Sequence, residues 1–183
     1  MDIDLVVFDL DFTLWDAGGT WCDHLSPPFK VSSKGVSDAR GNIINLYPDA
    51  MKIFQVIEGN SIPMAIASRT EEPEWARQLL ELLGIRDKFK YEEIFPDSKI
   101  THFNNLKERS GFNFTKMIFF DDEPRNTIEV GDLGVHCSLI RSGINMIAFK
   151  GFTTPYHFFK IIINVHIYAG LEAGLFTTAI PTT

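Results

Sequence analysis

The amino-acid sequence predicts an α/β protein, in which helices cover both faces of an open parallel sheet. Apolar runs with the length and β-branched content of buried strands alternate along the chain with segments of helical periodicity. Acidic residues directly follow two of these runs, which indicates a charged site at one edge of the sheet. With 183 residues and no internal repeat, the chain fits a single domain with a sizeable core.

Five segments are predicted as strands. The first, 5–8, is a short apolar run with the letters LVVF, and 62–68 and 116–122 are runs of the same kind. A short strand is expected around residues 93–95, and the letters VHCSLI at 135–140 indicate the last one. Since helical segments separate these strands, we expect them to run parallel to one another.

Four helices are predicted between the strands. Pro48 opens the first, which ends before Gly59. The second, 71–85, has its apolar residues in one stripe and stops near a glycine. The third and fourth, 97–111 and 124–134, have helical spacing as well. The elements therefore alternate along most of the chain.

Two segments depart from this alternation. Residues 16–46 are polar and contain DAGG, SPPF and SSKG, so we predict a loop or hairpin there, at the entrance of a substrate site. After a domain of residues 1–150, residues 151–183 form an atypical apolar tail. Charged residues such as Lys160 and Glu172 argue against a membrane span in this tail. The tail is either a packed terminal helix or strand, or a divergent end that packs incompletely.

The charge and cysteine content restrict the partners and the compartment. The net charge is −7, from 17 basic and 24 acidic side chains, so we expect neither nucleic acid nor a membrane as a partner. Cys22 and Cys137 have no metal-binding or redox spacing, and the acidic N-terminus has no basic region of the signal-peptide type. We therefore expect a cytoplasmic protein, and a monomer.

Polar side chains follow the predicted strands at the points where the strands end. Because ligands of open α/β sheets bind outside the carboxyl ends of the strands, these side chains should converge at one edge. The residues concerned are Asp9, Asp11, Ser68, Arg69, Lys99, Asp121 and Asp122. Neighbouring carboxylates raise each other's ionisation cost, so a cation is expected between them. Oxygen ligands without a histidine cluster indicate Mg²⁺ rather than zinc or copper, and a phosphate group would balance the remaining positive charge.

Taken one at a time, these residues also have structural explanations. Ser68 and Thr13 are typical of turn caps, and Lys99 is typical of a solvated helix residue. Asp121 and Asp122 are typical of a helix N-terminus. All of these explanations together would require a coincidence at four strand ends, so we favour a functional site.

Four motifs in order resemble a known superfamily. FDLDFT, AIASRT, DSK and FFDDE are similar to the motifs of the haloacid dehalogenase (HAD) superfamily of aspartate-nucleophile phosphotransferases. From about residue 3 to about residue 148 the chain resembles its small magnesium-dependent phosphatases, of acid phosphatase type, in segments such as PPF, LYP and SKITHF. The resemblance implies a Rossmann-like HAD fold with a minimal cap domain or none, because only residues 16–46 are left to form a lid.

The resemblance also implies an activity and a role for single residues. The activity is magnesium-dependent hydrolysis of phosphomonoesters, on phosphotyrosine or another phosphoprotein or on a phosphorylated small molecule such as a sugar phosphate. Asp9 matches the nucleophile that forms an aspartyl-phosphate, and Asp11 matches the general acid and base. Asp9, the backbone carbonyl of Asp11, and Asp122 match the metal ligands, with Asp121 supporting them. The residues matched to phosphate or substrate contacts are Leu10, Asp11, Thr13, Ser68, Arg69 and Lys99.

Two other functions share part of this pattern. A signalling receiver domain also gathers acids, a hydroxyl and a lysine, but it begins with an acidic pair and carries its lysine last. Here Lys99 precedes the pair Asp121-Asp122, which disfavours a receiver. A non-catalytic phosphate-binding module would keep the fold alone, yet no residue of the catalytic set is missing. Trp15 and Trp21 either line the substrate entrance or pack within the protein.

Overall fold

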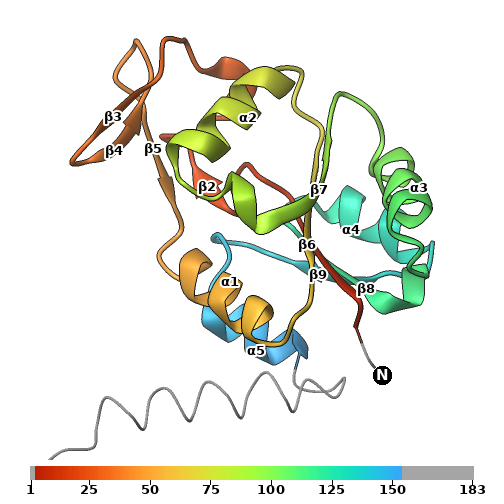
Figure 1. Cartoon of the computed structure of the whole chain (residues 1–183). Helices are drawn as coiled ribbons and strands as arrows, with labels where there is room; N and C mark the ends of the chain where they lie inside the picture. Colours follow the sequence, from red (N-terminus) through yellow and green to blue (C-terminus); the bar gives the residue numbers. More distant parts are fainter. Residues whose placement is uncertain (1–2, 154–183) are drawn as a thin grey trace, which may run out of the picture.

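The computed structural model describes residues 3–153, in which helices lie on both sides of a central sheet (Figure 1). The strands of this sheet are β1 (Leu5–Phe8), β6 (Met64–Ser68), β7 (Phe89–Ile94), β8 (Met117–Asp121) and β9 (His136–Leu139). The order across the sheet is β7-β6-β1-β8-β9, and every neighbouring pair is parallel. The predicted fold class is confirmed.

Five helices accompany the sheet within the described residues. They are α1 (Ala50–Gly59), α2 (Pro73–Leu82), α3 (Lys99–Ser110), α4 (Pro124–Gly131) and α5 (Met146–Thr153). Side chains alternate across β1, since successive residues of a strand point to opposite faces. Val6 and Phe8 belong to the core cluster that includes residues of α1, α2 and α5. Leu5 and Val7 belong to the cluster that includes residues of α3 and α4.

Most element ends shift by a few residues from the sequence predictions, and one helix was not predicted. The first helix begins at Ala50 rather than Pro48, because Asp49 occupies the N-cap position. The strand expected at 93–95 begins at Phe89 and ends at Ile94; Lys90, Glu92 and Glu93 interrupt its apolar residues, so it does not form an apolar run in the sequence. Helix α5 was not predicted. It is held by Phe149, which is buried against Phe120 with ring centroids 5.8 Å apart.

Residues 16–46 contain more structure than the predicted loop or hairpin. The hairpin is formed by β3 (Lys30–Ser32) and β4 (Gly35–Ser37), and it projects from the body of the molecule (Figure 1). With β5 (Ile43–Leu46) and β2 (Trp15–Asp16) it makes a four-stranded antiparallel sheet in the order β2-β5-β4-β3. A 3-10 helix, η1 (Cys22–His24), precedes the hairpin.

Asp38 organises the turn between β4 and β5. Its buried carboxylate accepts hydrogen bonds from the backbone N–H groups of Ser26, Arg40 and Asn42, at 3.0, 2.9 and 2.8 Å, and from the Asn42 side chain at 2.9 Å. Burial by itself would raise the pKa of Asp38, but these hydrogen bonds bring the pKa below its ordinary value. The turn is therefore tied through one side chain to the segment that follows η1.

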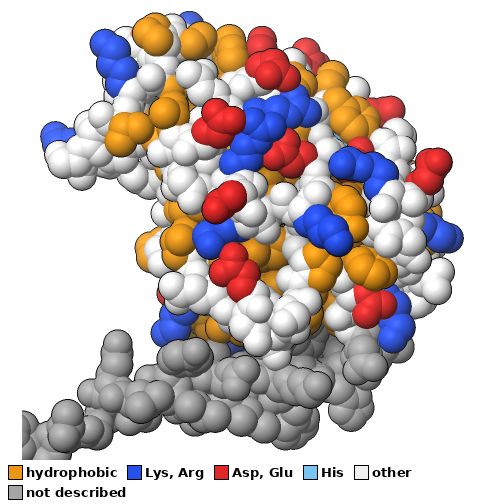
Figure 2. Space-filling view, in the orientation of Figure 1, with side chains coloured by type: hydrophobic (Ala, Val, Ile, Leu, Met, Phe, Trp, Pro, Cys, Tyr) orange, Lys and Arg blue, Asp and Glu red, His pale blue; other side chains and the backbone are white. Residues whose placement is uncertain are grey.

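On the face shown in Figure 2, acidic and basic side chains interleave. Arg77 pairs with Glu74 at 2.6 Å and Glu92 at 3.4 Å, and Arg86 pairs with Glu81 at 2.5 Å and Glu92 at 2.8 Å. Pairs at the surface contribute little to stability, about 0–1 kcal/mol each. They do neutralise the charges near α2 and β7.

The C-terminal tail is only partly covered by the structure. The domain boundary expected at residue 150 falls within α5, whose last three residues belong to the segment predicted as the tail. The remainder of that segment, 154–183, lies outside the described residues. Within residues 3–153, no helix has the length and apolar character needed to span a membrane.

Candidate active site

The candidate site lies where the strand order of the central sheet reverses. From β1 the chain continues to β6 and β7 on one side, and then returns to β8 on the other side of β1. Open α/β sheets bind ligands outside the carboxyl ends of their strands at such a switch point. Asp9 directly follows β1, and its backbone N–H donates to the carbonyl of Phe120 in β8 at 3.0 Å. The residues after β1 and β8 are thereby held side by side.

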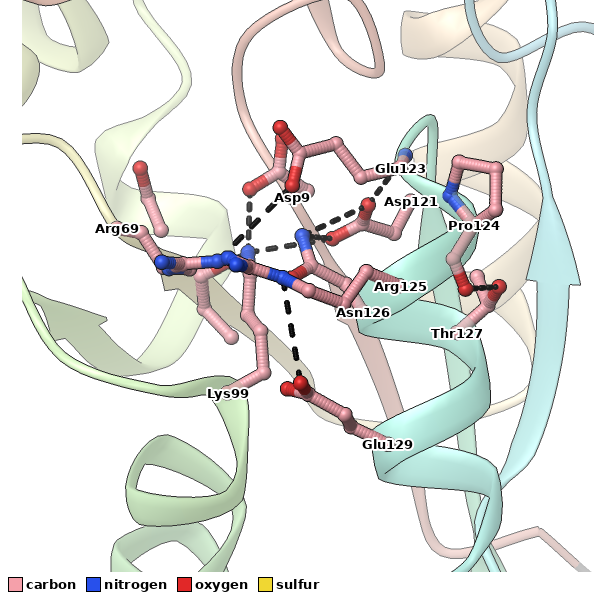
Figure 3. Close-up of polar contacts among 12 residues, drawn as sticks. Asp9, Arg69, Lys99, Asp121, Glu123, Pro124, Arg125, Asn126, Thr127 and Glu129 are labelled. Carbon is pink, nitrogen blue, oxygen red and sulfur yellow. Dashed lines mark hydrogen bonds and ion pairs between the residues drawn. The ribbon is translucent and has the colours of Figure 1, made fainter.

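Lys99 places a positive charge against both of these strand ends. Ser98 caps α3 by accepting a hydrogen bond from the backbone N–H of Thr101, so Lys99 is the first residue of the helix. Its fully buried ammonium group donates to Asp9 Oδ1 at 2.5 Å, and its Nζ lies 3.3 Å from Asp121 Oδ2 (Figure 3). It also donates to the carbonyl of Ala67 at the end of β6. One cation therefore connects β1, β6 and β8.

The pKa values of this cluster reflect burial opposed by charge pairing. Burial raises the pKa of Asp9 well above its ordinary value, although the neighbouring Lys99 ammonium acts to lower it. For Lys99, burial acts to lower the pKa, but the carboxylates of Asp9 and Asp121 raise it above its ordinary value. The ammonium group therefore stays charged at neutral pH, and it can screen an anionic group brought to Asp9.

Asp121 and Asp122 have different surroundings. Asp121 is fully buried, and its carboxylate oxygens accept from Asn126 Nδ2 at 3.1 and 3.0 Å and from the backbone N–H of Glu123 at 2.7 Å. The Asn126 amide oxygen in turn accepts from Arg69 at 3.3 Å (Figure 3). Asp122 is half-buried and lines the cavity, and its pKa is raised to about 6 by burial and by the charge of Asp121.

The Asp11 carboxylate is held by the loop after β1 and by η1. It accepts a hydrogen bond from Trp15 Nε1 at 2.7 Å, and the backbone N–H of Cys22 lies 3.1 Å from both of its oxygens. Phe12, in the same loop, adopts a left-handed conformation with φ of 56°. Burial raises the pKa of Asp11 to about 6, although these two hydrogen bonds act to lower it. Both protonation states of Asp11 are thus accessible near neutral pH.

These groups surround a cavity of about 240 Å³ that opens to solvent. Of the residues predicted from the sequence, six line it, namely Asp9, Asp11, Ser68, Arg69, Lys99 and Asp122. Leu10 and Thr13 are fully buried and do not line it, so a phosphate contact from either stays a prediction. The Thr13 hydroxyl has no hydrogen-bond partner among residues 3–153. The two tryptophans differ: Trp15 is buried, whereas Trp21 is 50% exposed and lines the cavity.

Several further residues of the site were missed by the sequence analysis. Asn126 lies one helical turn after Asp122, and a polar residue at that spacing is the only sequence signal for it. Asp23, from η1, accepts hydrogen bonds from the Thr70 hydroxyl and from the backbone N–H of Glu71, the latter at 3.1 Å. No local pattern connects Asp23 to the segment after β6, because the two are brought together only by the fold.

The donor atoms at the cavity suit a hard cation. Asp9 and Asp122 both line the cavity and offer carboxylate oxygens. A metal contact from the backbone carbonyl of Asp11 stays a prediction. Within the described residues, no group of three Asp, Glu, His or Cys side chains is arranged to hold a metal. The assignment of Asp9, Asp122 and the Asp11 carbonyl as ligands therefore stays a prediction.

A model of the Acid Phosphatase family matches residues 3–155. The chain belongs to this family. Over 144 residues it is 48% identical to Magnesium-dependent phosphatase 1 of Homo sapiens. This alignment covers 78% of this chain and 80% of the relative. A HAD-like hydrolase superfamily protein of Schizosaccharomyces pombe is 35% identical, over 79% of this chain and 90% of the relative.

Solved structures support the fold of this acid phosphatase family member. A HAD-family enzyme of Bacteroides thetaiotaomicron, solved in complex with magnesium and inorganic phosphate, aligns with a TM-score of 0.59. The alignment covers 79% of this chain and 97% of that one, at 12% sequence identity. At such low identity the likeness establishes the fold alone, and it confirms the HAD fold that the four motifs implied.

Proposed function

We propose that this acid phosphatase family member is a magnesium-dependent phosphomonoester hydrolase with Asp9 as its nucleophile. The observation that carries the proposal is the buried contact between Asp9 and Lys99 at the switch point of the sheet, with Asp11 beside it on the same cavity. A buried carboxylate that keeps one oxygen against an ammonium group and borders an open cavity is suited to attack an electrophile there. The human relative is named Magnesium-dependent phosphatase 1, which agrees with the metal and the reaction.

The reaction follows from the roles of two carboxylates. Asp9 attacks phosphorus, the bond from phosphorus to the leaving oxygen breaks, and the protonated Asp11 gives its proton to that oxygen. Water then attacks the aspartyl-phosphate, Asp11 takes up a proton from this water, and Asp9 is released with inorganic phosphate. The pKa of about 6 at Asp11 suits a group that must first give and then accept a proton near neutral pH.

The remaining polar groups bind the phosphoryl group and hold the nucleophile. Lys99 and the Ser68 hydroxyl bind phosphoryl oxygens, while Asp121 and Asn126 keep Lys99 in place. Asp9, Asp122 and the carbonyl of Asp11 would hold Mg²⁺. The ion would supply charge neutralisation and orientation of the phosphoryl group.

For the substrate we propose an aryl phosphate such as phosphotyrosine, presented on a protein or a peptide. Within residues 3–153 no separate cap domain covers the cavity, and from the segment 16–46 only Trp21 and Asp23 line it. Trp21 is 50% exposed, and its ring meets Phe12 edge-on at 5.8 Å, so an aromatic leaving group could pack against it. Sugar phosphates are the alternative substrate class.

The test is a panel of phosphomonoesters with Mg²⁺ and with EDTA. p-Nitrophenyl phosphate, a phosphotyrosine peptide and a hexose phosphate are compared by phosphate release. We expect magnesium-dependent turnover that is highest on the two aryl substrates and absent in Asp9→Asn. Undiminished turnover in Asp9→Asn would overturn the assignment of the nucleophile, and a preference for the hexose phosphate would overturn the substrate class.

A further inference from the structure

A second groove lies next to the candidate active site, on the other side of η1. It has a volume of about 560 Å³, against about 240 Å³ for the phosphate-binding cavity. Asp23 lines both, whereas His24, Pro27, Arg40 and Trp75 line only the groove. A substrate whose phosphate occupies the cavity can therefore extend past Asp23 into the groove.

The walls of this groove are fixed by hydrogen bonds. The Asp38 carboxylate binds the backbone N–H groups of both Ser26 and Arg40, and the Ala39 N–H donates to the carbonyl of Ser26 at 2.7 Å. The opposite wall is Trp75 of α2, whose ring packs edge-on against Phe29 at 6.3 Å. The groove is therefore formed before a substrate arrives.

Arg40 is the distinctive charge of the groove. Its backbone is held by Asp38, but its exposed guanidinium group has no ion-pair or hydrogen-bond partner within residues 3–153. The Asp23 carboxylate, by contrast, already accepts from Thr70 and Glu71. In a chain of net charge −7, a rigid turn thus presents an unpaired cation beyond the phosphate-binding cavity.

We propose that the groove binds the polypeptide that flanks the phosphorylated residue of a protein substrate, and that Arg40 pairs with an acidic side chain of that segment. The inference rests on the proposed function and specifies its substrate class. The larger volume favours several amino-acid residues over the second anionic group of a small metabolite. Because Asp23 stands between the two cavities, the acidic residue should be separated from the phosphorylated residue rather than adjacent to it.

The test uses pairs of phosphotyrosine peptides that differ only in carrying Glu or Gln at one position. Across the set, this position lies one to four residues before or after the phosphotyrosine. We expect a Glu/Gln ratio of kcat/KM of about two- to fivefold at the favoured position, the size of one exposed ion pair. Arg40→Gln should bring this ratio to about one, and Arg40→Glu should invert it and favour Lys peptides. Lys34→Gln makes the same change of charge in the β3–β4 turn, outside the groove, and should keep the wild-type ratio.

Several results would overturn the proposal. They are a ratio of one at every position in the wild type, a ratio that survives Arg40→Gln, and an equal loss in Lys34→Gln. If Arg40→Gln instead lowers kcat/KM only for small carboxylated phosphomonoesters, the groove serves a small anion. If the wild type hydrolyses p-nitrophenyl phosphate but its Glu/Gln ratio is one for every peptide pair, the groove proposal is refuted and the proposed function stands. No hydrolysis of any phosphomonoester by the wild type would refute the proposed function, and the groove proposal with it.

Discussion

Replacing Lys99 with methionine would remove the cation from the centre of the site while keeping most of the side-chain volume. Lys99 is fully buried, with its Nζ 2.5 Å from Asp9 and 3.3 Å from Asp121, so the variant leaves two buried carboxylates without their shared partner. Removing one member of a buried ion pair typically costs about 3–5 kcal/mol. We expect a loss of this size in the free energy of unfolding, together with the loss of phosphatase activity.

The loss should depend on pH in a defined direction. Burial already raises the pKa of Asp9, and without Lys99 that pKa rises further. A carboxyl group whose pKa is higher in the folded than in the unfolded protein makes its full contribution to the free energy of unfolding at pH values below the unfolded pKa. This contribution is lost as the pH rises through the folded pKa. The difference between the variant and the wild type should therefore be largest near neutral pH and shrink in acid.

Urea denaturation in EDTA measures this free energy at each pH. Lys52→Met, an exposed lysine on α1, is the matched control, and it should change the stability by no more than about 0.5 kcal/mol. The double variant Lys99→Met with Asp121→Asn should recover part of the loss, because it removes one of the uncompensated charges. A Lys99→Met protein as stable as the control variant at neutral pH would refute the argument.

Three further predictions concern other residues. Asp11→Asn should lower kcat for alkyl phosphates by about 10²–10⁴-fold and for aryl phosphates by much less, which steady-state kinetics on both classes will measure; equal losses would contradict its role as the acid. Magnesium should stabilise the wild type by about 2.7 kcal/mol at a hundredfold excess over its Kd, and Asp122→Ala should lose most of this gain in melting curves; an unchanged response would place the metal elsewhere. Asp38→Ala removes the acceptor of four hydrogen bonds and should cost about 1.5–3 kcal/mol in urea denaturation at neutral pH. Because the pKa of Asp38 is lowered in the folded protein, this cost should fall as the pH drops through that pKa, and a cost that does not depend on pH would count against the charged carboxylate as its source.

The sequence predicted the parts of the fold that rest on local patterns. The strands β1, β6 and β8 are apolar runs buried on both faces, and such runs have few alternatives. The edge strand β7 was predicted too short, since Lys90 and Glu92 interrupt its apolar pattern. Helix α5 was missed because its place depends on a distant contact, that of Phe149 with Phe120.

The part of the candidate site that lies at the ends of the parallel strands could also be predicted from the sequence. Asp9 and Asp122 directly follow strands, and Lys99 opens the helix after β7, so their convergence follows from the topology of a parallel sheet. Asp23 and Arg40 lie in a segment whose small antiparallel sheet is specified by pairings that no local pattern reveals. For the same reason, the groove beyond the phosphate-binding cavity could not be inferred from the sequence.

The central claim is that Asp9 carries the phosphoryl group during turnover. Rapid mixing with an aryl phosphate and Mg²⁺, an acid quench and borohydride reduction would convert an aspartyl-phosphate into homoserine, which peptide mass spectrometry locates. We expect homoserine at position 9 in the wild type, a higher yield in Asp11→Asn because the hydrolysis of the intermediate is slowed, and none in Asp9→Asn. Homoserine at another aspartate, or burst-free turnover in which position 9 is never modified, would contradict it.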